Sequence, residues 1–164
     1  MFHYFVRYCE RTDDIVAVGH TNTPGEIPLQ GDANKGLLVV EADGATIMAG
    51  TPSRDTYLEA VRVHLCRTVD DEARSRMSDP FIDIHAAQAA EARGETVGTP
   101  YLDALRSATG QTEKDVVAAI KEQAAAADAM KARINARRQA AKQQIRAATT
   151  IGEIVAAGVI EWDA

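Results

Sequence analysis

Residues Glu113–Ala148 read EKDVVAAIKEQAAAADAMKARINARRQAAKQQIRAA, a run of helix-forming residues that contains no glycine or proline. The run predicts one continuous helix of 36 residues. At about 1.5 Å per residue this helix would be roughly 54 Å long. Thr112 and Asp115, at its start, resemble a capping box with aspartate in place of glutamate. One long helix is therefore expected to dominate the C-terminal half of the chain.

Small apolar residues recur every seven positions along this run and form what we call the seam. Its heptad positions are Ile120, Ala127, Ile134, Ala141 and Ala148, with Ala124, Met130 and Ile145 between them. Heptad spacing indicates packing of helix on helix. Each alanine in place of a leucine contributes roughly 2 kcal/mol less free energy from burial, at about 0.8 kcal/mol per CH₂. We therefore expect the helix to pack against neighbouring elements or chains. In an isolated monomer its isoleucines would be partly exposed to solvent, unless the shorter helices cover them. The predicted contact residues are Ile120, Ala127, Met130, Ile134, Ala141 and Ile145.

A run of cations without an intervening acid flanks the seam. It consists of Lys131, Arg133, Arg137, Arg138, Lys142 and Arg146. Three interpretations stay open: a solvated face that favours the helix C-terminus, a surface for an acidic protein partner, or a nucleic-acid surface. The acidic partner would be residues 1–98 of the same chain or of a neighbour. No aromatic residue interleaves with the cations, so stacking on single strands has no support.

The segment after the long run predicts a short hook. Thr150 and Glu153 have the spacing of a capping box, and Gly158 ends the helix that this box would begin. Ile154, Ile160 and Trp162 are apolar, and we expect them to fold back onto the long helix near Ile145.

Before the long helix, residues 2–50 predict a small antiparallel sheet. Residues 2–9 and 15–18 alternate or are β-branched, and residues 37–41 form a third β-rich run. Asp43-Gly44 is a strong two-residue turn signal, which makes residues 45–49 a fourth strand.

Two helices are expected after this sheet, over residues 52–77 and 80–93. The Thr51-Pro52 and Asp79-Pro80 pairs each resemble an N-cap followed by proline at the first helical position. Leu58, Val61, Leu65 and Val69 form an apolar stripe on the first helix, suited to cover the sheet.

The predicted fold is thus α+β, with a domain over 1–94, a linker over 95–98 and a helical region over 99–164. Thr99-Pro100 repeats the cap-and-proline signal and starts a short helix in that last region.

The composition and charge exclude several classes of protein. The chain has 164 residues, 46% of them hydrophobic, and a net charge of −6, which gives no electrostatic case for nucleic acid over the whole chain. Residues 1–98 carry net −7 and residues 99–164 net +1, by count from the sequence. No apolar run approaches the ~18 residues of a membrane span, and the N-terminus does not resemble a signal peptide. Cys9 and Cys66 form no CxxC pair, and two reduced thiols are expected.

No motif in the sequence predicts catalysis, a cofactor or a metal. His85 and Glu91 diverge around a helix, and His64 with Cys66 lacks the second half of a zinc pattern. Nucleotide-binding glycine patterns and a nucleophile elbow are absent from the sequence. We therefore expect a protein that is not an enzyme, with no catalytic, cofactor-binding or metal-binding residues.

Two stretches resemble small tail proteins of tailed bacteriophages. The N-terminal stretch is an aromatic-rich strand followed by Ile15–Gly19, Ile27–Gln30 and Gly36–Glu41. The C-terminal stretch is similar to tail-fibre accessory and assembly proteins, and it comprises Thr99–Leu105, Ala108–Thr112, Arg137–Ala140 and Ile145–Ile154. Together the two stretches cover roughly two-thirds of the chain. Residues 51–94 match no known pattern.

The resemblance implies a non-enzymatic structural protein of the virion tail, made in the cytoplasm of a bacterial host. It would join or decorate a tail-fibre or baseplate component, with other tail proteins or copies of itself as partners and without membrane or nucleic acid. An alternative is a tail-fibre assembly chaperone that stays out of the mature virion. A third reading, a small DNA-binding regulator, depends on the basic run alone.

Overall fold

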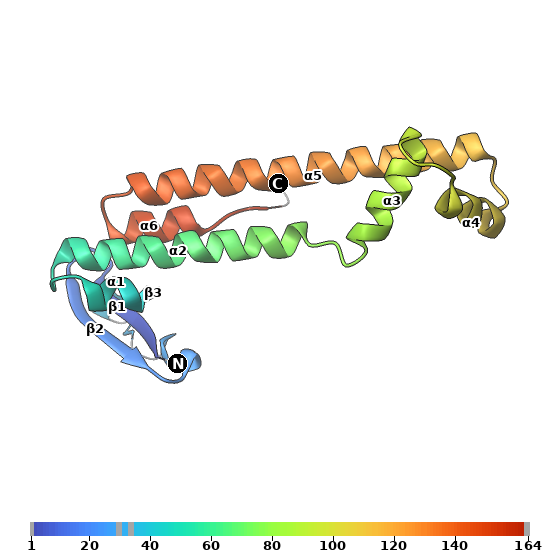
Figure 1. Cartoon of the computed structure of the whole chain (residues 1–164). Coiled ribbons are helices and arrows are strands. Elements are labelled where there is room, and N and C mark those ends of the chain that lie inside the picture. Colours follow the sequence, from blue (N-terminus) through green and yellow to red (C-terminus); the bar gives the residue numbers. More distant parts are fainter. Residues whose placement is uncertain (1, 29–30, 33–34, 163–164) are drawn as a thin grey trace. The chain divides into compact units, whose positions relative to one another are not determined.

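The computed structural model describes residues 2–28, 31–32 and 35–162 and has an α+β fold (Figure 1). Contacts divide the chain into two compact units. Unit 1 comprises Met1–Arg74 with Ala136–Ala164, and unit 2 comprises Ser75–Asn135. This division differs from the predicted domains, because the predicted linker at residues 95–98 lies within unit 2. The parts of the sequence predictions that concern residues 29–30, 33–34 and 163–164 lie outside the described residues.

Unit 1 begins with a three-stranded antiparallel sheet in the order β2-β1-β3. Its strands are β1 (His3–Cys9), β2 (Ile15–Thr21) and β3 (Leu37–Ala42), and a short 3₁₀ helix, η1 (Pro24–Glu26), follows β2. The register pairs Val6 of β1 with Val18 of β2 and with Val40 of β3. Val6 is fully buried and Val40 nearly so, so this face of the sheet contributes to the core.

The predicted fourth strand is wrong, because residues 44–49 form helix α1 (Gly44–Ala49). The Asp43 carboxylate accepts hydrogen bonds from the Thr46 backbone N–H at 2.9 Å and from the Thr46 hydroxyl at 2.8 Å. Aspartate is thus a helix N-cap here, a role as common for it as a hairpin turn. Gly44 is required by a close approach, since a Cβ on it would lie 2.3 Å from the Tyr4 ring.

Helix α2 (Arg54–Met77) begins two residues after the predicted start at Pro52. Ser53, not Thr51, caps it: the Ser53 hydroxyl accepts a hydrogen bond from the Thr56 N–H. Leu58, Val61 and Val69 are buried, as expected of the stripe. The start of α2 is tied to the end of the sheet, because the Asp43 N–H donates to the Ala60 carbonyl at 2.9 Å.

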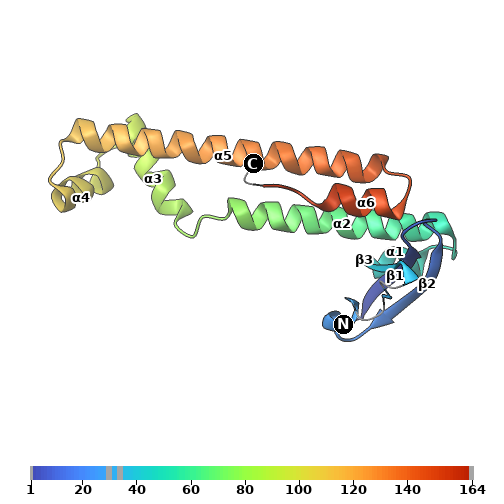
Figure 2. The same ribbon diagram turned by 180° about the vertical axis from the view of Figure 1, so that it is seen from behind.

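The end of the chain also belongs to unit 1. Helix α6 (Ile151–Gly158) has the predicted capping box between Thr150 and Glu153. In Figures 1 and 2, α6 lies beside α2 and the C-terminal part of α5 (Glu113–Ala147). The side chains of Ile145, Ile151 and Ile154 are fully buried, and Trp162 is buried too, so the hook is docked on its own chain.

Polar contacts over long sequence separations fasten the hook. The Asp13 carboxylate accepts hydrogen bonds from the backbone N–H groups of Ile151 at 2.7 Å and Gly152 at 3.2 Å. It also pairs with Arg54 at 2.7 Å. Asp13 has a φ of 57°, and it lies in the turn between β1 and β2. This carboxylate, which we call the Asp13 clasp, complements the positive end of the α6 dipole.

Unit 2 contains helices α3 (Ile82–Arg93) and α4 (Pro100–Thr109) and the first part of α5. Helix α3 begins two residues after the predicted start at Pro80. Between α3 and α4, Gly94 and Gly98 have φ values of 75° and 92°, which favour glycine. The predicted long helix is confirmed over 35 residues, and Asp115 donates its backbone N–H to the Thr112 hydroxyl at its start.

Candidate protein-docking groove

The three helices of unit 2 share a small hydrophobic core. Ala92 of α3, Leu102 of α4, and Val116 and Ile120 of α5 are buried together. Each helix contributes few large side chains, so this core holds the helices at one end only. Other residues of α3 and α5 lie outside this core, and several of them line a groove.

A buried carboxylate joins α3 to α4. Glu91 accepts hydrogen bonds from the backbone N–H groups of Tyr101 at 3.2 Å and Leu102 at 2.9 Å. It therefore caps α4, whereas the predicted cap, Thr99, makes no such side-chain bond. Capping from a neighbouring helix satisfies the free amides of the first turn. It also fixes where α3 ends relative to α4 within the unit.

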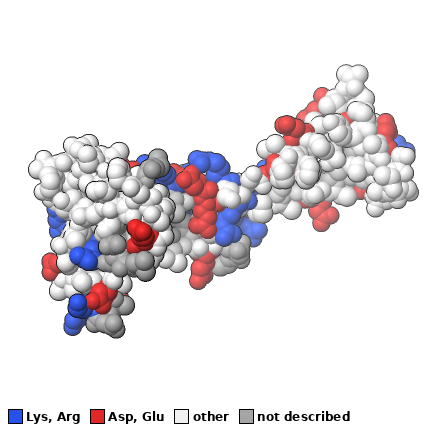
Figure 3. Space-filling model, turned by 90° about the horizontal axis from the view of Figure 1, so that it is seen from below, with Lys and Arg blue, Asp and Glu red and all other residues white. Residues whose placement is uncertain are grey.

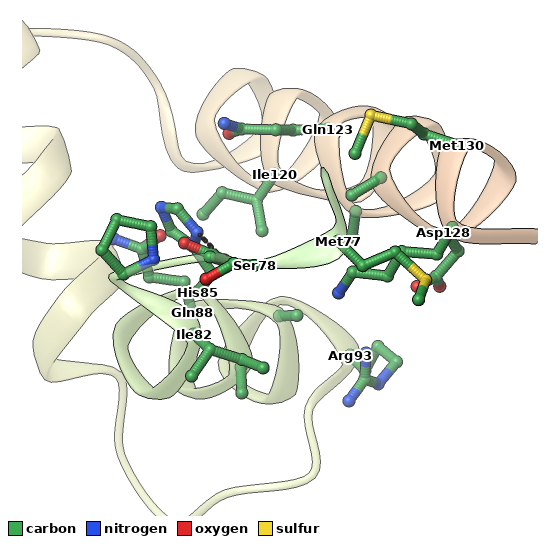
Figure 4. Close-up of a pocket in the computed structure, with 17 residues that line it drawn as sticks. Met77, Ser78, Ile82, His85, Gln88, Arg93, Ile120, Gln123, Asp128 and Met130 are labelled. Atoms are coloured by element: carbon green, nitrogen blue, oxygen red, sulfur yellow. Dashed lines mark hydrogen bonds and ion pairs between the residues drawn. The ribbon is translucent and has the colours of Figure 1, made fainter. Parts of the chain in front are cut away.

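Between α3 and α5 the structure forms an open groove with a volume of about 510 Å³ (Figure 4). Alanines from both helices line it, which keeps its floor low. Larger apolar side chains border it: Met77 at the end of α2, Ile82 of α3, and Ile120 and Met130 of α5. The lining alanines are Ala86 and Ala89 of α3 and Ala124 and Ala127 of α5.

Exposed apolar side chains gather around this groove. Ile82 is 53% exposed and Met130 40% exposed, although both border the groove. Phe81 and Ile84, near Ile82 in the sequence, are exposed as well but do not line the groove. Exposed apolar side chains at the border of a groove are a feature of interaction sites. Methionine at such a surface adapts its shape to different side chains.

A carboxylate–imidazole pair organises one end of the groove. Asp79 accepts a hydrogen bond from the Phe81 N–H at 2.9 Å, and its other oxygen lies 2.7 Å from His85 Nδ1. The hydrogen bond to His85 is the main cause that holds the pKa of Asp79 below its usual range. The Phe81 ring packs edge-on against the His85 ring, with centroids 6.2 Å apart. The pair therefore positions Phe81 at the entry to α3.

The structure divides the predicted seam into two parts. Ile120, Ala127 and Met130 line the groove. Ile134, Ala141 and Ile145 are buried within the chain and do not line it. Ile120, Ile134 and Ile145 are each less than 9% exposed in the single chain, so the alternative stated with the prediction holds: other parts of the chain cover these isoleucines.

The basic run is divided as well. Arg138 and Lys142 both pair with Asp70 of α2, Arg138 at 2.8 Å. Arg137 donates to the Glu161 carbonyl. The two contacts with Asp70 agree with the interpretation in which residues 1–98 of the same chain supply the acidic partner. Lys131 lines the groove, while Arg133 and Arg146 are exposed. Figure 3 shows acidic and basic atoms side by side on the face that it presents, not one basic patch.

Sequence reasoning missed the α3 side of the groove. Asp79 was interpreted as a helix cap, and His85 was considered as a metal ligand and set aside because it diverges from Glu91 around the helix. Ala86 and Ala89, three residues apart, place two small side chains on one face of α3, and this spacing was the available signal. Met77 and Ile82 carry no periodic signal that separates a groove wall from a core position.

Chemically, the groove combines an apolar floor with a polar and charged border that includes Gln88, Arg93 and Asp128. Its low alanine floor and flexible walls fit an amphipathic helix of another protein, a common mode of recognition. Among the described residues, no group of three or more His, Cys, Asp or Glu is placed to hold a metal ion. Cys9 and Cys66 are free thiols. A search of the described helices for a segment able to cross a membrane found none.

Comparison of the chain with protein-family models, with curated proteins and with solved structures gave no match. The groove is therefore interpreted from its own geometry.

Proposed function

We propose that the chain is a non-enzymatic structural protein of a bacteriophage tail that joins a tail-fibre or baseplate component to the particle. The observation that supports this proposal most strongly is the groove between α3 and α5, with exposed Ile82 and Met130 at its border. A groove of this kind serves binding between proteins. The tail itself is proposed from the sequence resemblance.

Two of the segments that carry the resemblance lie in helices and strands that the structure describes. Ile15–Gly19 lies in β2, and Ile145–Ile154 spans the junction between α5 and α6 with its capping box. The described part of the sheet thus has a defined hairpin where the resemblance begins, and the Asp13 clasp links this hairpin to α6. These links fasten the β1–β2 hairpin to α6 within unit 1, as a joining protein requires of its mounting part.

A groove-filling variant tests the binding role. Ala127→Trp places a large ring on the groove floor, whereas Ala125→Trp adds the same ring at an exposed position that does not line the groove. The partner for the assay is the fibre or baseplate protein encoded beside this chain. Isothermal titration should show that Ala127→Trp weakens binding at least about tenfold and that Ala125→Trp changes it less than about twofold.

Mass spectrometry of purified particles tests the place in the tail. A structural protein is present in mature virions at a fixed ratio to other tail proteins. A chain that binds the fibre protein but is missing from virions is an assembly chaperone instead. A chain that neither binds the neighbouring tail protein nor enters virions contradicts the proposal. Salt-dependent binding to DNA would support the regulator instead.

A further inference from the structure

Strand β2 forms an edge of the sheet in unit 1. The described strands follow the order β2-β1-β3, and β2 pairs only with β1, through residues Ile15–Thr21. Every second backbone N–H and C=O group of an edge strand points away from the sheet. In the part of the chain that the structure describes, no strand pairs with that outer side.

The sequence of β2, IVAVGHT, lacks most devices that protect an edge. It contains no proline and no Asp, Glu, Lys or Arg, although proteins place such residues on edges to prevent pairing. The register shift opposite Arg7 and Tyr8 places a bulge at Val16, so the regular part of the edge is Ala17–Thr21. Val16 itself is 52% exposed.

Gly19 does not weaken this edge. A Cβ on Gly19 would lie 2.4 Å from Cζ of Phe5, its partner on β1. The Phe5 ring therefore covers the glycine from the neighbouring strand, an arrangement that stabilises glycine in sheets. The Phe5 ring is itself buried. The strand is thus firmly held on its inner side while its outer side stays available.

The charge around the strand selects the occupant. Asp14 precedes β2, and Glu26 follows it, held by the Thr21 hydroxyl at 2.8 Å. If two copies paired through β2 in antiparallel orientation, the start of each strand, beside Asp14, would lie next to the end of the other, beside Glu26. Like charges would then meet at both ends. A segment with basic ends meets opposite charge at both ends instead.

We propose that β2 accepts an extended segment of another protein as an added strand, one rich in β-branched residues and flanked by Lys or Arg. Backbone hydrogen bonds supply the affinity in this mode, and the alternating side chains supply the selectivity. The surface is separate from the groove, which lies in unit 2. The proposal does not depend on the proposed tail function.

The probe is a lysine-flanked peptide of alternating valine and threonine, as long as β2. Adding it to the isotope-labelled full chain should shift the amide resonances of residues 15–21 and leave those of the groove residues unchanged. The same peptide with glutamate ends should bind at least about tenfold more weakly at low salt, because like charges then meet at both ends. Equal binding of the two peptides contradicts the proposed charge selection.

Paired variants locate the binding surface. Val16→Lys with His20→Lys adds two cations to exposed positions of β2, and Met48→Lys with Val159→Lys adds two at exposed apolar positions elsewhere in unit 1. The first pair should weaken peptide binding at least about tenfold and the second less than about twofold. Circular dichroism confirms that both variants are folded. Equal effects of the two pairs, no shifts at residues 15–21, or a dimer formed through β2 would each overturn the proposal. Ala127→Trp should leave peptide binding intact, which separates this result from the groove test.

Discussion

Helix α5 behaves differently in the two units that it enters. In unit 1 its seam residues Ala141 and Ile145 are buried, and its cations Arg138 and Lys142 are paired with Asp70. In unit 2 its seam residues Ala127 and Met130 border an open groove. The same heptad pattern therefore serves internal packing in one stretch and borders an open groove in the other. A heptad row alone does not reveal which of these it does.

The largest expected difference between the stretches is in stability. Ile145→Ala removes a fully buried side chain, and such changes in a core cost about 2–5 kcal/mol of unfolding free energy. Met130→Ala removes a side chain that is already 40% exposed, and we expect a cost below about 1 kcal/mol. Urea denaturation followed by circular dichroism measures both. Equal costs would mean that Met130 is packed as tightly as Ile145, and the groove would then not be open.

A smaller effect is expected from the charges that hold α5 to α2. Burial alone would raise the pKa of Asp70, but the hydrogen bonds from Lys142 and Arg138 outweigh it and hold that pKa below its usual range. The ionised form is thus favoured by folding. The stabilisation is fully present above the pKa of the unfolded chain, near 4, and is lost as the pH falls through the lower folded value.

Asp70→Asn tests this sign. The variant should lose about 1 kcal/mol of unfolding free energy at pH 7, because the three side chains are only partly buried and solvent screens them. Below pH 3 the difference from the parent should shrink. Asp71→Asn is the matched control, since Asp71 makes an exposed pair with Arg74 on the same helix. A difference that grows on acidification would contradict the assigned sign.

The smallest effect concerns the end of the groove. Because the hydrogen bond to His85 lowers the pKa of Asp79, His85→Ala should raise that pKa toward the usual value for aspartate. A carboxyl carbon titration by nuclear magnetic resonance measures it directly. The backbone bond from Phe81 to Asp79 does not depend on His85, so α3 should keep its start. An unchanged pKa would show that the imidazole does not influence the carboxylate.

Local signals predicted much of the fold. The long helix and the α6 capping box depend on residues within one or two turns, and both are confirmed. Asp43-Gly44 misled because aspartate before glycine suits either a hairpin turn or a helix start. The deciding contact, the Tyr4 ring against Gly44, joins residues 40 positions apart.

The site was harder to predict for the same reason. Ile120, Ala127 and Met130 were identified from their period, but so were Ile134, Ala141 and Ile145, which the chain itself covers. Which part of a row stays open depends on where other helices end. In unit 2 the position of the end of α3 is fixed partly by the hydrogen bonds that Glu91 accepts from α4. No local sequence pattern predicts a cap that comes from a neighbouring helix.

The Asp13 clasp has a consequence for the order of events during synthesis. Asp13 leaves the ribosome long before its amide partners, because Ile151 and Gly152 follow it by 138 and 139 residues. Unit 1 therefore cannot complete its fold until all of unit 2 has been synthesised. Contacts so distant along the chain form slowly, because a large loop must close first. The nascent sheet and α2 stay partly bare until α6 emerges, and this interval is when a folding helper would have the most to do.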